Sequence, residues 1–278
     1  MKYAICNEMF FEVKWEIEKQ FEVAAELGFD GIEIAPFTLN DWVQEITEEQ
    51  KQRIRQASAD TGVAACGIHW LLVGPTGLHI TDPDPEVRAK TVAYCQDLVR
   101  FGLEIGAEYE VVGSPGQRKV KTEQGVTYQQ AWEWFKEAMA ACALVEGGEN
   151  FRVCIEPLAG STNNNFLFNH HEAVKMSREI NLPNVGVILD TYSGLQTESD
   201  LPEAIRETDD LLFHYHCNDI NQRAPGLGDT DFVPIMRALL DIHYPYYASI
   251  EVFDFTPDPM EQCRVGLATL QDALAAAS

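Results

Sequence analysis

The sequence predicts an α/β fold, a single (β/α)8 TIM barrel over residues 1–278, from two observations. Short apolar, β-branched runs alternate with helical patterns from end to end, and eight such pairs fit a chain of 278 residues. These apolar runs are continuous, which is typical of parallel strands that are buried on both faces. An open doubly wound sheet is the alternative, but Cys6–Phe10 stands where that fold usually has a glycine-rich phosphate loop.

Each predicted strand is an apolar run bounded by glycine, proline or polar residues. In chain order the predicted strands are Tyr3–Cys6, Gly31–Ala35, Val63–Ile68, Tyr109–Gly113, Phe151–Glu156, Val185–Leu189, Leu211–His216 and Tyr247–Val252.

The predicted helices fill the intervals between these strands. The first places Ile17, Phe21 and Ala24 on one face and stops at Gly28, because glycine favours the backbone of a helix end. Pro85 suits the first turn of the longest helix. The remaining helices are Glu48–Thr61, Pro85–Ile105, Tyr128–Val145, Asn169–Ile180, Leu201–Thr208, Phe232–Ile242 and Met260–Ala276. A polar loop is predicted over Ser114–Val126.

The charge of the chain narrows the classes of partner. With 20 basic and 44 acidic residues, the formal net charge is -24, and such a surface repels nucleic acids and anionic membranes. No apolar run reaches the roughly 18 residues that a membrane span requires. Met1–Tyr3 leads into a strand and does not resemble a secretory signal. The seven scattered cysteines form no CxxC pair and predict reduced core residues of a cytoplasmic protein.

Four metal-ligating side chains lie at the ends of successive apolar runs in the second half of the chain. They are Glu156, Asp190, His216 and Glu251. A buried strand that ends in an unpaired carboxylate is costly, and neighbouring barrel strands bring their ends together on one face. Three carboxylates and one imidazole suit Mn²⁺, Mg²⁺ or Co²⁺ better than Zn²⁺. We therefore expect one divalent cation, with Mn²⁺ as the first choice.

Around these residues the sequence resembles the xylose-isomerase-like sugar isomerase/epimerase superfamily, and within it the ketose 3-epimerase (tagatose and psicose epimerase) branch. The resemblance covers most of the chain. The motifs that carry it are Gly28–Glu33, Ile155–Leu158, Pro183–Val185, Leu189–Thr191, His214–His216, Pro225–Gly228 and Ser249–Glu251.

The resemblance implies that Glu156, Asp190, His216 and Glu251 bind the metal and that Glu156 and Glu251 also form an acid/base pair. The implied activity is that of a metal-dependent sugar isomerase or epimerase of carbohydrate metabolism. One carboxylate removes a proton from the carbon next to a ketose carbonyl, a metal-stabilised enediolate forms, and the other carboxylate returns a proton to the opposite face. The expected partner is a small sugar or keto-sugar, and the oligomeric state stays open between a monomer and a homo-oligomer.

Two departures from the epimerase branch bear on the substrate. Ser193 stands where the branch has a histidine, and Gln222 stands in the slot of an arginine, with Arg223 one place on. Both Ser193 and Arg223 are therefore candidate substrate contacts.

Three further candidates follow the third and fourth strands. Trp70 forms a pocket wall or packs a loop, and His69 binds substrate or is structural. Arg118 clasps a substrate oxygen or is an exposed loop charge.

Other functions remain open. The same metal and bases could expel water or an alkoxide from a keto-sugar or keto-inositol, as a dehydratase or lyase does. A non-catalytic sugar-binding barrel is a further alternative, although binding alone does not require both Glu156 and Glu251. The related DNA-repair endonucleases use a histidine-rich three-metal cluster, which Ser193, Asp231 and the acidic surface oppose.

Overall fold

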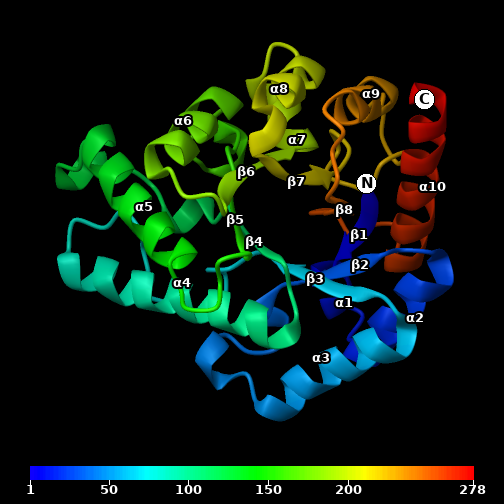
Figure 1. The fold of residues 1–278 in the computed structure, drawn as a ribbon, viewed down its shortest axis with the longest axis horizontal. Helices are drawn as coiled ribbons and strands as arrows, with labels where there is room; N and C mark the ends of the chain where they lie inside the picture. Colours follow the sequence, from blue (N-terminus) through cyan, green and yellow to red (C-terminus); the bar gives the residue numbers. More distant parts are fainter.

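The computed structural model describes residues 1–278, and its centre is a closed barrel of eight parallel strands in sequential order (Figure 1). Ile5 of the first strand pairs with Ile32 of the second and with Ile250 of the eighth, which closes the ring. The larger helices surround the strands (Figure 1). The predicted (β/α)8 barrel is therefore confirmed.

The strands agree with the predicted ones to within one or two residues at each end. They are β1 (Lys2–Cys6), β2 (Gly31–Ile34), β3 (Ala64–Ile68), β4 (Tyr109–Val112), β5 (Arg152–Ile155), β6 (Val185–Asp190), β7 (Leu212–Cys217) and β8 (Tyr247–Ile250).

The α-helices include every predicted one. They are α1 (Glu8–Phe11), α2 (Ile17–Leu27), α3 (Glu48–Thr61), α4 (Pro85–Ile105), α5 (Tyr128–Ala143), α6 (His170–Ile180), α7 (Thr191–Thr197), α8 (Leu201–Thr208), α9 (Val233–Asp241) and α10 (Pro259–Ala277). None of them combines the length and the hydropathy that a membrane span requires.

Local sequence signals account for most helix ends. Thr47 and Thr127 each form a capping box with the glutamine three residues later, which satisfies backbone donors at the starts of α3 and α5. Gly28, Gly62 and Gly106 end α2, α3 and α4 in the left-handed conformation, which glycine adopts without steric cost.

Two short helices were not predicted, and both begin within two residues of the end of a strand. Helix α1 follows Asn7, and α7 follows Asp190, whose side chain caps the new helix. The predicted loop over Ser114–Val126 also contains two short 3₁₀ segments, Pro115–Gln117 and Thr122–Gln124. Segments of one or two turns carry too little apolar periodicity to be recognised from sequence.

Successive side chains of a strand point to opposite faces, and this alternation separates two cores. In β1, Tyr3 and Ile5 join the large core between strands and helices, whereas Ala4 joins a smaller cluster on the other side of the strands. In β5, Val153 and Cys154 divide in the same way. The polar side chains described below also lie on this inner side, beyond the smaller cluster.

Glu110 is a titratable residue buried on the side of β4 that faces the large core between strands and helices. It is completely buried on β4 between Tyr109 and Val111, and neither carboxylate oxygen has a hydrogen-bond partner. Burial raises the pKa of this carboxyl to about 8. The folded chain therefore holds a proton on Glu110 at pH values where the unfolded chain has released it.

This proton makes stability depend on pH. Because the folded-state pKa lies above the ordinary value of 4.5, the free energy of unfolding falls as pH rises from about 4.5 towards 8. Glu110→Gln removes the titration, so we expect its stability relative to the native protein to rise between pH 5 and pH 8, by on the order of a few kcal/mol. Urea unfolding at both pH values measures this. The exposed Glu146→Gln is the control, and an equal effect of Glu110→Gln at both pH values would contradict the explanation.

Candidate active site

The carboxyl ends of the strands bring three of the four predicted metal ligands together. Ligand atoms of Glu156, His216 and Glu251 lie within 4.8 Å of one another, and all three side chains are buried. Glu156 directly follows β5, His216 lies near the end of β7, and Glu251 directly follows β8. Oxygen and nitrogen donors at this spacing can hold a divalent cation.

Asp190, the fourth predicted ligand, lies at the end of β6 beside this group, but its oxygens have other partners. Oδ1 accepts a hydrogen bond of 2.6 Å from the backbone nitrogen of Ser193, and Oδ2 accepts one of 2.6 Å from Asn218. Burial, and then the charge of Glu251, raise the pKa of Asp190 to about 6. Its role as a ligand stays a prediction.

Glu156 and Glu251 differ in how the protein supports their charge. Burial, and then the nearby Glu251, raise the pKa of Glu156 to about 8. Burial also opposes ionisation of Glu251, but the imidazole of His216 and the hydrogen bond from Trp70 lower the pKa of Glu251 below its ordinary value. His216 and Arg118 lower the pKa of Glu156 less than burial and Glu251 raise it, and no cationic group bonds its carboxylate.

His216 is held between two carboxylates. Its Nδ1 lies 3.1 Å from Oε2 of Glu251, and its Nε2 lies 3.3 Å from Oε2 of Glu33 on β2. Burial alone would lower the pKa of His216, but Glu251 and Glu33 raise it well above the ordinary value. Carboxylates that fix the orientation of a ligating histidine are usual around protein metal sites. Glu33 follows a register irregularity between β2 and β3, and such irregularities re-aim side chains.

His69 takes part in the same buried network and not in the pocket wall. Its Nε2 lies 2.6 Å from Oε2 of Glu8, and its Nδ1 lies 3.9 Å from Oε2 of Glu33. Both His69 and Glu8 are almost completely buried. The structural alternative for His69 therefore describes its position better than substrate contact does.

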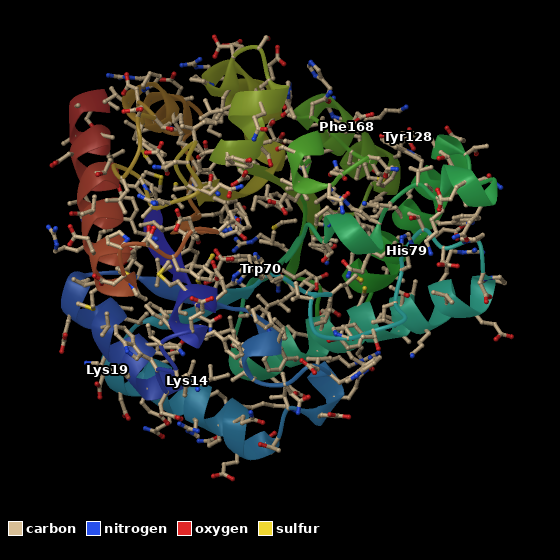
Figure 2. The ribbon with its side chains drawn as sticks, turned by 180° about the vertical axis from the view of Figure 1, so that it is seen from behind. Lys14, Lys19, Trp70, His79, Tyr128 and Phe168 are labelled. Carbon is tan, nitrogen blue, oxygen red and sulfur yellow. The ribbon has the colours of Figure 1, made fainter.

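Trp70 connects the network to the pocket. Its indole nitrogen donates a hydrogen bond of 2.7 Å to Oε1 of Glu251, and its backbone has a φ of 51°, a region that bulky residues rarely adopt. Trp70 lies near the middle of the barrel in Figure 2. Backbone strain of this kind concentrates at functional sites, where surrounding contacts hold it.

A cavity of about 340 Å³ opens beside Glu156 and Glu251. Its walls come from the segments that follow β3, β4, β5, β6, β7 and β8. Trp70 lines it, and so do Gln222 and Tyr192. Its place at the carboxyl ends of the strands is where barrel enzymes have their active sites.

The other three candidate substrate contacts lie outside this wall. Arg118 is completely buried and donates hydrogen bonds to the carbonyl oxygens of Glu156 (2.6 Å) and Val112 (3.3 Å), so the prediction of an exposed loop charge is wrong. Ser193 is buried with an unpartnered hydroxyl, and Arg223 pairs with Asp254 at 2.8 Å. Whether they contact substrate stays a prediction.

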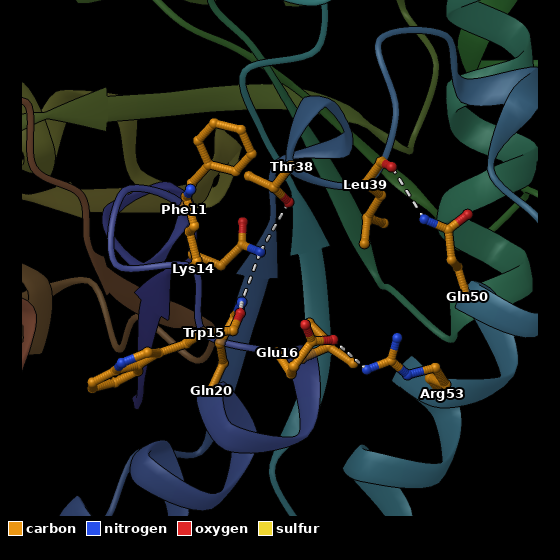
Figure 3. Close-up of a pocket in the computed structure, with 11 residues that line it drawn as sticks. Phe11, Lys14, Trp15, Glu16, Gln20, Thr38, Leu39, Gln50 and Arg53 are labelled. Atoms are coloured by element: carbon orange, nitrogen blue, oxygen red, sulfur yellow. Dashed lines mark hydrogen bonds and ion pairs between the residues drawn. The ribbon is translucent and has the colours of Figure 1, made fainter.

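A second hollow, of about 240 Å³, lies near the starts of α2 and α3 and contains none of the metal-ligand candidates (Figure 3). Most of its polar groups bind one another: Asn7 donates to Gln20 and Thr38, and Arg53 pairs with Glu16. These internal bonds leave few groups free for a ligand.

Most residues of the pocket wall were missed by sequence reasoning, and two of them bear directly on the glutamates. Gly113 lines the pocket, and a Cβ atom there would lie 2.1 Å from Oε2 of Glu156. Phe253 lines it as well. The spacing of two residues from Glu251 was an available signal for Phe253, because alternate residues of an extended segment share a side.

A closed (β/α)8 barrel with acidic and imidazole side chains at the carboxyl ends of its strands is the architecture of TIM-barrel enzymes. The chain belongs to the xylose isomerase-like TIM barrel family, whose model matches residues 21–273. Curated relatives are named as sugar epimerases and a sugar isomerase, and the chain, as a member of the same family, is an enzyme.

Two curated relatives cover most of the chain. A D-psicose 3-epimerase of Ruminiclostridium cellulolyticum is 27% identical over 263 residues, which are 91% of this chain and 84% of the relative. A 3-dehydro-D-guloside 4-epimerase of Escherichia coli K12 is 24% identical over 98% of this chain and 99% of its own length.

Solved structures show the same fold. The apo form of 3-keto-D-glucoside 4-epimerase from E. coli has a TM-score of 0.81 at 24% identity, covering 98% of this chain and 99% of that one. A D-psicose 3-epimerase of Clostridium cellulolyticum H10 with D-tagatose has a TM-score of 0.79 at 22% identity, covering 100% and 96%. At these identities the likeness supports the fold alone.

Gly113 gives a direct test of the metal site. Gly113→Ala pushes its Cβ against the carboxylate of Glu156, so we expect Mn²⁺ affinity to fall at least about tenfold, as is typical when groups behind a metal ligand are changed. Gly116→Ala is the matched control, since a Cβ at Gly116 in the same loop meets nothing within 4 Å. Calorimetric titration with Mn²⁺ measures both, and equal affinities would contradict the placement of Glu156.

Proposed function

We propose that the protein is a divalent-metal-dependent epimerase that inverts the carbon next to the ketone of a sugar or sugar derivative. The observation that carries this proposal is the grouping of Glu156, His216 and Glu251 within 4.8 Å at a pocket of the barrel mouth. Two carboxylates from non-adjacent strands meet there, which is what proton transfer to and from two faces of one carbon requires.

The side chains fit a resident divalent cation. Glu156 is buried beside Glu251, and burial together with this neighbouring carboxylate raises its pKa, so a cation at this place would stabilise its ionised form. Gly113 leaves room for its carboxylate, and Glu33 orients His216. Glu156, His216 and Glu251 would hold the ion, with Asp190 as the fourth ligand, and Mn²⁺ suits this donor set, with Mg²⁺ and Co²⁺ as alternatives. When bound, the ion polarises the substrate ketone and so makes the neighbouring proton more acidic.

The residues of the chain account for the proton movements. One of the two glutamates takes the proton from the carbon next to the ketone, and the C–H electron pair moves into an enediolate of the substrate. The other glutamate then donates a proton to the opposite face of the same carbon. The carbon is inverted, no atom is lost, and neither oxidant nor reductant is needed. The hydrogen bond from Trp70 holds Glu251 in place for its part.

The names of the relatives support epimerisation over the other activities. Both curated relatives described above are epimerases, one acting at carbon 3 of a ketose and the other at carbon 4 of a 3-dehydroglycoside. Elimination by a dehydratase or lyase would use the same bases, but its product has a different mass.

Incubation of the Mn²⁺-loaded protein with free ketoses and keto-glycosides in D₂O tests the proposal. We expect an epimer that carries one solvent-derived deuterium at the inverted carbon and is otherwise unchanged in mass. NMR and mass spectrometry read both properties. A product that has lost water or an alcohol would show that the protein is a lyase and not an epimerase. If no substrate exchanged hydrogen for deuterium, proton transfer at this carbon would be refuted.

The two glutamates are the residues to remove. Glu156→Gln and Glu251→Gln keep the size of the side chain but cannot act as bases, so we expect each to lower kcat/KM by about 10³-fold or more. The exposed Glu149→Gln is the matched control and should leave the rate unchanged. Activity of either active-site variant within tenfold of the native protein would contradict the two-base assignment.

Removal of the metal gives an independent check. We expect dialysis against a chelator to abolish activity and added Mn²⁺ to restore it, because the uncatalysed ketone does not acidify its neighbouring proton enough. Turnover by protein shown to be free of metal would contradict the metal dependence.

A further inference from the structure

We infer that the substrate is a neutral keto-glycoside whose anomeric oxygen carries an apolar, ring-containing group. This inference rests on the proposed function and adds the class of substrate to it. It depends on which side chains the pocket offers beyond the metal-ligand group.

No cationic side chain lines the pocket. The two arginines nearest in sequence to its walls are not among the lining residues: Arg118 is completely buried, with one nitrogen donating to carbonyl oxygens, and Arg223 pairs with Asp254. Recognition of phosphate or carboxylate groups depends on arginine, lysine or clustered backbone amides. In a chain with a net charge of -24, a phosphorylated or acidic sugar would be repelled as well.

Apolar residues make up most of the wall away from the two glutamates. They are Trp70, Val73, Val111, Pro115, Leu158 and Phe253. The free hydroxyl groups of an open-chain ketohexose would face these residues without hydrogen-bond partners, which is costly. An apolar substituent would instead gain from the same surface.

The apolar wall continues to the outside of the molecule. Val73 is 52% exposed and Phe253 is 40% exposed, although both line the cavity. Phe37, Trp70 and Phe253 form a stacked series with successive ring centroids 5.7 Å apart. Aromatic rings at an open rim offer a surface on which another ring can stack.

The size of the cavity agrees with a substituted sugar. Its volume of about 340 Å³ lies within the range of about 300–1,000 Å³ in which pockets hold ligands of drug size. The polar lining is limited to a few groups, among them Thr162, Tyr192 and Gln222, which suffices for one sugar ring. The sugar would lie at the glutamates and the apolar group at the rim formed by Val73 and Phe253.

Binding of unreactive glycosides tests the inference separately from catalysis. Phenyl β-D-glucoside, methyl β-D-glucoside and glucose 6-phosphate are titrated into the Mn²⁺-loaded protein and followed by calorimetry. We expect the phenyl glycoside to bind at least tenfold more tightly than the methyl glycoside, which corresponds to about 1.4 kcal/mol. Glucose 6-phosphate should bind most weakly.

Val73→Asp places a charge on the proposed rim and should reduce the preference for the phenyl glycoside to less than threefold. Leu144→Asp is the control, because Leu144 is an exposed apolar residue outside the lining of this cavity. The phenyl and methyl 3-keto-glucosides are then compared by deuterium uptake, and the phenyl compound should have the higher kcat/KM.

Equal affinity for the phenyl and methyl glycosides, or tighter binding of the phosphate, would overturn the inference. So would a Val73→Asp variant that changes the sedimentation of the protein but not its glycoside preference, since the rim would then be a contact between copies of the chain. Failure of the proposed function has another signature: no substrate would take up deuterium, whatever the order of affinities.

Discussion

The burial of negative charge at the barrel mouth is the constraint on which the site depends. Glu156, Asp190 and Glu251 converge there, and His216 is the one cationic partner in direct contact with Glu251. Arg118 lies close to Glu156 but donates to its backbone carbonyl. Buried carboxylates without a partner either take up protons or bind a cation. The divalent ion that we propose would resolve this conflict and would also supply the electrophile that the proposed reaction needs.

The two halves of the barrel contribute different groups to the site. The second half, from β5 to β8, supplies the metal-ligand candidates, and the first half supplies the groups that hold them. Glu33 on β2 is in hydrogen-bond contact with His216, and Trp70 after β3 donates a hydrogen bond to Glu251. Gly113 after β4 leaves space for the carboxylate of Glu156. This division explains why buried polar residues lie deep in the first half, where no ligand to the metal is expected.

The sequence allowed most of the fold to be predicted, because continuous apolar runs and glycine-marked helix ends follow from local physics. The helices α1 and α7 could not be predicted, since segments of four and seven residues next to a strand end carry too little apolar periodicity to be recognised. Grouping of Glu156, His216 and Glu251 followed from the parallel order of the strands. The contacts of His69 and Arg118 could not be predicted from this strand order. A side chain beyond a strand end can turn either into the pocket or beneath it, and its direction depends on the packing around it.

Anomalous X-ray diffraction at the manganese absorption edge, from crystals grown with Mn²⁺, would locate the metal ion. We expect one strong peak within coordination distance of carboxylate oxygens of Glu156 and Glu251 and a ring nitrogen of His216. This peak should border the cavity that Trp70 lines. A peak elsewhere, or none at this site with the two glutamates turned apart, would contradict the proposed metal site.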